Sequence, residues 1–177
     1  MPIKAWWFCP ADRKLANGDG RLIRRNTTHV HRGPLVICHS GLHASRRILD
    51  AVNYAPGPIL CRVECNGDVI EEDDKLVCRR RTYLAVVDAS EMLCKFARLC
   101  AQDVVDKWDT PSVVREYLRT GDEELRAAAR AASWAASWDA AKAASWDAKA
   151  AARAAQQRRL HCMAMALMRP AATETGG

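Results

Sequence analysis

The 177-residue sequence lacks the features that define several large classes of protein. It contains no apolar run of about 18 residues, so we expect no membrane-spanning helix. It begins without the basic and then apolar stretch of a secretory signal, and its eight cysteines form no Cys-x-x-Cys pair. We therefore expect a soluble cytoplasmic protein with reduced, mostly buried thiols rather than a disulfide-bonded scaffold.

Glycine and proline are absent from residues 122–169, where alanine dominates and Ala-Ala-Ser-Trp occurs three times. Because alanine has the highest helix propensity, this segment is predicted to be one helix roughly 70 Å long at about 1.5 Å per residue. Its tryptophans wind slowly around that helix, and burying them against a second chain would stabilise an oligomer. The residues expected to mediate this self-association are Trp134, Trp138, Trp146, Leu160, Met163 and Leu167. The alternative is a helix that lies along its own domain.

The chain is moderately basic, with a net charge of +6, and most of its cations are arginines. They cluster at Arg24/Arg25, Arg46/Arg47, Arg79/Arg80/Arg81 and Arg158/Arg159. Such clusters can bind phosphates or carboxylates through paired N–H donors, or they can simply form a solvated surface. Nucleic-acid binding through these arginines therefore remains an alternative, and it predicts an affinity that falls steeply with salt.

The pattern of apolar residues predicts an α+β fold with a small, mostly antiparallel sheet at residues 1–89. Within it we expect strands at 3–9, 21–25, 35–38, 59–65, 69–70, 76–78 and 83–87, a helix from an N-cap at Ser45 to Tyr54, a hairpin turn at Asn66-Gly67 and an acidic loop at 71–74. Residues 90–121 are predicted to form two connecting helices, at 91–107 and 111–120, that pack on this head and end at Gly121. Asp122 would then begin the long helix, and residues 170–177 would form a disordered tail.

The densest group of reactive side chains is Cys38-His39-Ser40-Gly41-Leu42-His43, between a predicted strand and a predicted helix. We expect a ligand pocket here, with His43 as a hydrogen-bond donor or proton shuttle, or else a histidine that is only bonded to backbone in the core. The ligand-binding candidates are Cys38, Gly41, His43, Arg46, Arg47 and Tyr54.

Two chemical alternatives at the same place have weaker support. Paired Cys-x-x-Cys or His-Glu-x-x-His elements are missing, so we expect no metal and no cofactor. A nucleophilic pair of Cys38 and His43 would need a third, orienting group that the sequence does not provide, and we assign no catalytic residue.

Residues 3 to 88 resemble an uncharacterised domain family that is frequent in phage and prophage genomes. The resemblance rests on Cys38-x-x-Gly41-Leu42-His43-Ala44, on residues 53–64 (NYAPGPILCRVE) and on residues 74–77 (DKLV). Members are similar in having a Cys-x-x-Gly-Phe/Leu-His element and an alanine-rich tail. The resemblance implies a phage accessory protein that acts in the host cytoplasm and interferes with a host defence or regulatory component.

These observations favour a protein that is not an enzyme. Its head would bind a host protein or a small anionic ligand, and its long helix would make a homo-oligomer. The alternative is an enzyme that acts on a nucleotide-like substrate, with a pocket around His43 and Arg46.

Overall fold

A computed structural model describes residues 1–15, 19–107, 109–129 and 146–169. They belong to two compact units. The first unit, here called the sheet unit, contains residues 1–90 together with the chain from Leu160 onward, and the second contains Glu91–Arg159. The α+β class is confirmed, because an antiparallel sheet is combined with helices that follow it in the chain.

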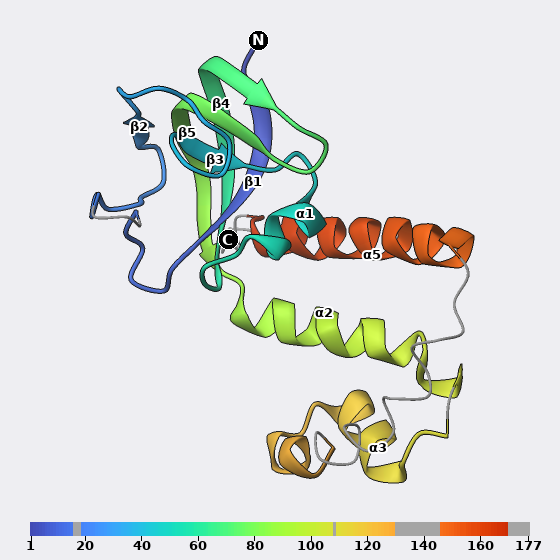
Figure 1. Cartoon of the computed structure of the whole chain (residues 1–177). Helices are drawn as coiled ribbons and strands as arrows, with labels where there is room; N and C mark the ends of the chain where they lie inside the picture. The colour runs from blue at the N-terminus through green and yellow to red at the C-terminus, as the bar shows by residue number, and fades with distance from the viewer. Residues whose placement is uncertain (16–18, 108, 130–145, 170–177) are drawn as a thin grey trace, which may run out of the picture. The chain divides into compact units, whose positions relative to one another are not determined.

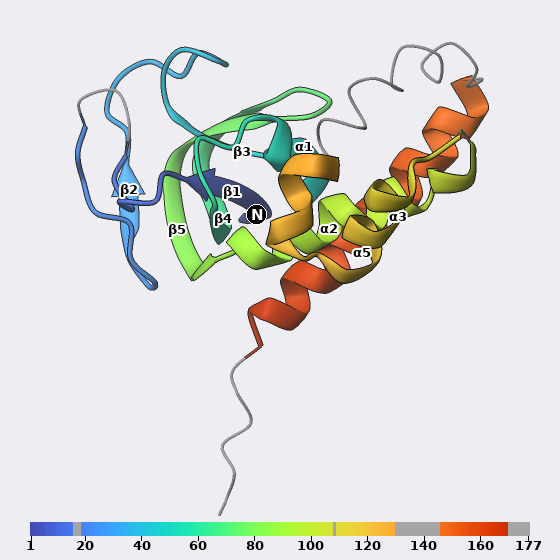
Figure 2. The ribbon, with the colours of Figure 1, turned by 90° about the horizontal axis from the view of Figure 1, so that it is seen from below.

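The sheet unit is built on five strands in which every neighbouring pair is antiparallel. The strands are β1 (Ile3–Cys9), β2 (Thr28–Val30), β3 (Leu42–Ala44), β4 (Ile59–Glu71) and β5 (Leu76–Asp88). Their order is β1-β4-β5-β2, and β3 also pairs with β5 (Figure 1). The short strand β2 lies at the outer edge of the sheet, as Figure 2 also shows. The long strand β5 thus pairs with each of the three other strands that follow β1, namely β2, β3 and β4.

Alternation along the strands builds the core, as the sequence predicts for residues 59–65. Cys61, Val63 and Cys65 of β4 are fully buried, whereas Arg62 and Glu64 between them are only partly buried. Cys9 and Cys78 join this core, so four of the eight thiols serve as small apolar side chains. All eight cysteines are free, and Cys38, Cys94 and Cys162 are exposed.

The predicted hairpin turn at Asn66-Gly67 is wrong. Strand β4 continues through these residues, and its register against β5 shifts between Asn66 and Val69. Gly67 has a φ of 77°, which suits a bulge as well as a turn. The true turn lies at residues 72–75, where the Glu72 N–H donates to the Lys75 carbonyl at 2.9 Å. As a result, the two strands predicted at 76–78 and 83–87 are one strand of 13 residues.

The strand predicted at 35–38 is also wrong. Val36 and Ser40 pair with each other across a tight turn, and Cys38 within that turn has a φ of 67°. A run of four apolar residues is too short to identify a strand, and the strand that follows is β3. The strand predicted at 21–25 is reduced to a single bridge between Lys14 and Leu22.

Ser45 is not a helix N-cap. Its backbone instead bonds that of Trp6 in both directions, at 2.7 and 2.9 Å. Helix α1 (Ile48–Asn53) begins later, with Arg47 at the N-cap position, and packs against β1.

The second unit is helical. It contains α2 (Ser90–Gln102, whose first residue belongs to the sheet unit), the 3₁₀ helix η1 (Val105–Lys107), α3 (Ser112–Thr120), a helical stretch at 123–129, and the first part of α5 (Trp146–Leu167). Gly121 ends α3 with a φ of 74°, as predicted. The Asp122 carboxylate then accepts the Glu124 N–H at 2.9 Å and begins the next helix. Among the described residues no helix is long and apolar enough to cross a membrane.

The long-helix prediction is supported at its two ends. Residues 123–129 and 146–167 are helical, whereas 130–145, with Trp134 and Trp138, lie outside the described residues, as do the side chain of Trp146 and the tail at 170–177. The last turns of α5 belong to the sheet unit, where Leu160 is fully buried and His161 meets the Trp6 ring edge-on at 5.5 Å. Met163 is half-buried and Leu167 is 40% exposed. Self-association stays a prediction, and Leu160 already has a buried place in its own chain.

Candidate functional site

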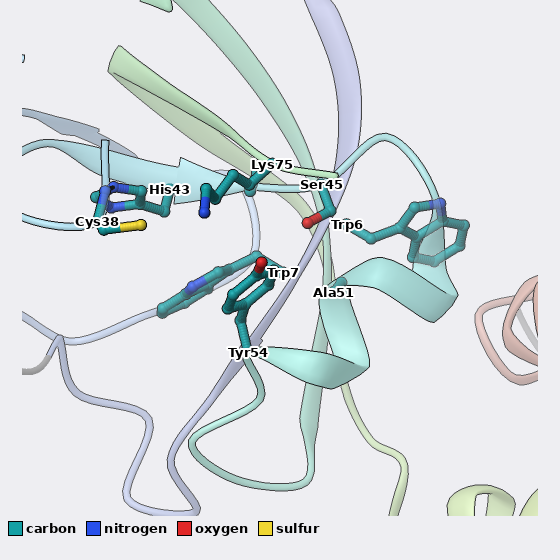
Figure 3. A pocket seen from close by; sticks show the side chains of 9 residues that line it. Trp6, Trp7, Cys38, His43, Ser45, Ala51, Tyr54 and Lys75 are labelled. Atoms are coloured by element: carbon teal, nitrogen blue, oxygen red, sulfur yellow. Dashed lines mark hydrogen bonds between the residues drawn. The ribbon is translucent and has the colours of Figure 1, made fainter. Parts of the chain in front are cut away.

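Two adjoining cavities lie in the sheet unit. The first has a volume of about 270 Å³ and is lined by Trp6, Trp7, Cys38, His43, Ala44, Ser45, Ala51, Tyr54 and Lys75 (Figure 3). The second has a volume of about 340 Å³ and is lined by Trp7, Leu15, Asp19, His31, His39, Ser40, Gly41, Leu42, His43, Tyr54, Pro56 and Arg81. The cavities share Trp7, His43 and Tyr54, so they are direct neighbours.

His43 comes from β3 and stands between the cavities. Its Nε2 atom accepts a hydrogen bond from the backbone N–H of Cys38 at 2.9 Å. Burial lowers the pKa of His43, and the nearby positive charge of Arg81 lowers it further. The imidazole is therefore neutral, and its acceptor nitrogen already holds the Cys38 turn in place. This arrangement positions Cys38 and leaves no free lone pair on Nε2 to remove a proton from its thiol.

Cys38 and Lys75 approach each other at the wall of the first cavity (Figure 3). A hydrogen bond with the Cys38 side chain raises the pKa of Lys75. The Lys75 ammonium lies 3.5 Å from a carboxylate oxygen of Glu72 and 5.3 Å from the centre of the Tyr54 ring. The Tyr54 hydroxyl donates to Asp74 at 2.5 Å. The turn between β4 and β5 thus fixes both an ammonium group and an aromatic ring at this cavity.

Arg81 of β5 is the least expected residue of the site, because only 1% of it is exposed. Its Nε and Nη2 atoms donate to the Tyr83 hydroxyl at 3.2 and 2.9 Å, and its Nη1 atom donates to the carbonyl of His43. The guanidinium also lies over the Trp7 ring, 3.7 Å from its centre. A guanidinium carries more N–H donors than these three bonds use. Within the described part of the chain no carboxylate forms an ion pair with it.

The surroundings of Arg81 leave its positive charge uncompensated. Asp19 lines the same cavity, but its two carboxylate oxygens bind Arg21 at 2.6 and 2.7 Å. Buried His29, whose Nδ1 lies 3.0 Å from the Tyr83 hydroxyl, has a pKa lowered by burial and by the charges of Arg21 and Arg81. Burial and the charge of Arg81 also lower the pKa of His43, so neither histidine adds a negative charge that could pair with Arg81.

The polar side of the second cavity is formed by the tight turn that contains Cys38. His31 Nε2 lies 3.0 Å from the Ser40 hydroxyl, which donates to the Pro34 carbonyl at 2.8 Å. His39 and Gly41 lie on the same lining. Despite these histidines, no group of three or more His, Cys, Asp or Glu side chains among the described residues is placed to hold a metal ion.

The structure brings together four of the six residues that the sequence selects as ligand-binding candidates. Cys38, His43 and Tyr54 line the first cavity, and Gly41 lines the second. Arg46 and Arg47 line neither, because Arg46 pairs with Glu71 and Arg47 pairs with Asp50 at 2.5 Å. Sequence reasoning missed Trp7, Lys75 and Arg81. The signal for Arg81 was its position two residues before Tyr83, which places both side chains on one face of a strand.

The arginine clusters are also largely occupied within the chain. Arg79 pairs with Asp68 at 2.8 Å and Arg159 with Asp103 at 2.7 Å, in addition to the pairs made by Arg46 and Arg47. Arg81 is buried. Five of the nine arginines in these clusters are thus paired or buried within the described part of the chain.

The lowered pKa of His43 gives a testable pH dependence. The unfolded chain takes up a proton on His43 near a pH of about 6.5, but the folded protein resists this until a lower pH. The free energy of unfolding should therefore fall as the pH drops through this range. We expect His43→Gln, whose amide oxygen can still accept the Cys38 N–H, to lose less stability than the wild type between pH 7.5 and 5.5 in urea titrations. In His43→Gln, the remaining dependence of the unfolding free energy on pH should come from His29. Equal losses in the variant and the wild type would show that His43 is not held neutral.

Comparison with known proteins finds one family model that is similar to part of the chain. Residues 23–95 match the family model described as a domain of unknown function (DUF7666). The matched segment contains β2 to β5, and with them Cys38, His43 and Arg81, but not Trp7. The match supports an uncharacterised domain family over this segment. No curated protein and no solved structure matches the chain at a significant level.

Proposed function

We propose that the sheet unit is a binding module for a small organic anion, which it holds in the two cavities around Trp7, His43 and Tyr54. The observation that carries this proposal is the burial of Arg81 without an ion-pair partner in the described part of the chain. Arginine is rarely buried unless its charge is paired, because transfer of a charge out of water is costly. A bound anion would supply the missing counter-charge.

The energetics favour a functional reason for Arg81 over a structural one. A buried ionic group often contributes less to stability than an apolar side chain of similar volume. The guanidinium is nevertheless held rigidly by Tyr83, by the His43 carbonyl and by the Trp7 ring. Because the guanidinium is already held in place, it loses little freedom when an anion binds. Its planar set of N–H donors matches a carboxylate or a phosphate.

Binding has more support than catalysis. The Nε2 atom of His43 accepts the Cys38 N–H and is therefore not free to act as a general base. The enzyme alternative would need His43 to release that bond when substrate binds.

The wider role is proposed from the resemblance to phage-borne domains. A module that captures a small anion could remove a signalling molecule or substrate from a host system, and self-association through the alanine-rich segment would multiply the number of sites. Identification of the ligand tests this role more directly than any property of the helix does.

Matched pairs of compounds test the binding proposal. Ribose 5-phosphate with ribose, and benzoate with benzamide, differ mainly in charge. We expect the anionic member of at least one pair to bind at least tenfold more tightly in calorimetry, with an affinity that weakens as salt rises. Equal affinity of charged and neutral members for the protein, or binding of neither, would contradict the proposal.

A further inference from the structure

We propose that the ligand is a nucleoside phosphate, with its base against Trp7 and Tyr54 in the first cavity and its phosphate beside Arg81 in the second. This inference rests on the proposed function and adds the chemical class of the ligand to it.

The first cavity suits a flat aromatic ring. Trp7 and Tyr54 form neighbouring walls (Figure 3). The small side chains Ala44 and Ala51 also line this cavity. Both rings are fixed before any ligand arrives. Arg81 covers the Trp7 ring, and the bond from the Tyr54 hydroxyl to Asp74 restrains the second ring. Stacking on such prearranged rings favours the binding of a base.

The size of the first cavity limits what it can hold. Its volume of about 270 Å³ lies just below the range of roughly 300–1,000 Å³ that is typical of sites for drug-sized ligands. It can therefore accept a single base, but not a large polycyclic molecule or a folded peptide segment.

The second cavity suits a phosphate. Its lining combines Arg81 with His31 and His39, and Gly41 adds backbone without a side chain. Several donors around one space match an oxyanion that accepts hydrogen bonds in several directions, whereas a carboxylate is satisfied by one planar fork. Lys75, at the wall of the first cavity, adds a further positive charge nearby.

Three lining residues are common to both cavities, which favours one ligand with an aromatic part and an anionic part. Trp7, His43 and Tyr54 contribute to both cavities, so one ligand that fills both would have its aromatic and anionic parts joined beside these three residues. A nucleoside phosphate has this composition, since an uncharged sugar links its base to its phosphate.

The experiment measures the base and the phosphate separately. Calorimetry with the full chain would compare the adenosine, guanosine, cytidine and uridine monophosphates with ribose 5-phosphate and with the four nucleosides. We expect at least one monophosphate to bind at least tenfold more tightly than ribose 5-phosphate and than its own nucleoside. Tyr54→Leu should reduce that advantage over ribose 5-phosphate on the order of tenfold. Tyr54→Phe, which keeps the ring and loses only the bond to Asp74, is the matched control and should retain most of the advantage.

Alkylation of Cys38 reports directly on the first cavity. Its exposed thiol lines that cavity, whereas the exposed thiols of Cys94 and Cys162 line neither and serve as internal controls. A bound monophosphate should slow the reaction of iodoacetamide with Cys38 at least fivefold, measured by peptide mass spectrometry, and leave the controls unchanged. Inorganic phosphate should not protect Cys38.

The outcomes separate this inference from the proposed function. If ribose 5-phosphate binds as tightly as every monophosphate, or if no monophosphate protects Cys38, the base does not occupy the first cavity and the inference fails, while anion binding stands. If no anion binds in either experiment, both fail.

Discussion

Replacement of Arg81 by methionine should abolish anion binding without unfolding the protein. The ligand-free variant loses a buried charge that has no ion-pair partner in the described structure, and it gains an apolar side chain of similar length. We therefore expect its free energy of unfolding in urea to lie within about 2 kcal/mol of the wild-type value. In calorimetry, the affinity for the best anion should fall at least a hundredfold, because charge and hydrogen bonds are lost together.

Two further variants make this result specific. Arg81→Lys keeps the charge but not the planar fork and should bind with intermediate affinity. Arg119→Met removes an exposed arginine that pairs with Glu116 in α3 and lines neither cavity, and it should leave the affinity intact. A loss of more than about 3 kcal/mol of stability in Arg81→Met would instead assign the guanidinium a structural role, as the support of Tyr83 and of the His43 carbonyl.

Gly41→Ala should strongly destabilise the sheet unit. Gly41 has a φ of 119°, a conformation that side chains rarely adopt, and a β-carbon there would lie 2.3 Å from Val77 Cγ2 and 2.9 Å from Leu35 Cδ2. Both the backbone strain and the overlap must be relieved by movement of the strand β3 region. We expect a loss of roughly 2–4 kcal/mol in the free energy of unfolding, measured by urea titration.

Gly20→Ala is the matched control for backbone strain. Gly20 also has a positive φ, of 66°, but a β-carbon there meets nothing within 4 Å. Its cost should be only about 1 kcal/mol. Equal losses in the two variants would mean that the close packing of Gly41 against Val77 and Leu35 does not constrain the site.

The fold could be predicted where local structure depends on residues that are close together in the sequence. The aromatic strand at 3–9, the alternation at 59–65 and the Gly121 terminator all depend on neighbours in sequence. The bulge at Asn66-Gly67 could not be distinguished from a hairpin turn, because Asn-Gly favours a positive φ in both and only the pairing of Val69 with Cys78 decides between them.

The candidate site could be predicted only in part for a similar reason. Cys38, Gly41 and His43 lie close together in the chain, so their density was visible in the sequence. Arg81 and Trp7 come from β5 and β1, and the sheet alone brings the guanidinium over the ring. A charged residue in an arginine run is normally expected at the surface, so its burial is a property of the fold.

The sheet unit is discontinuous in the chain. Its first segment ends at Ser90, and its second segment begins at Leu160. The three Ala-Ala-Ser-Trp copies therefore lie within the segment 91–159, which is preceded and followed in the chain by parts of the sheet unit. We expect that gain or loss of repeat copies can be tolerated without harm to the ligand pocket. A stop codon anywhere before residue 160 would instead remove His161 from the Trp6 ring, so that truncated chains would carry an incomplete wall beside the first cavity.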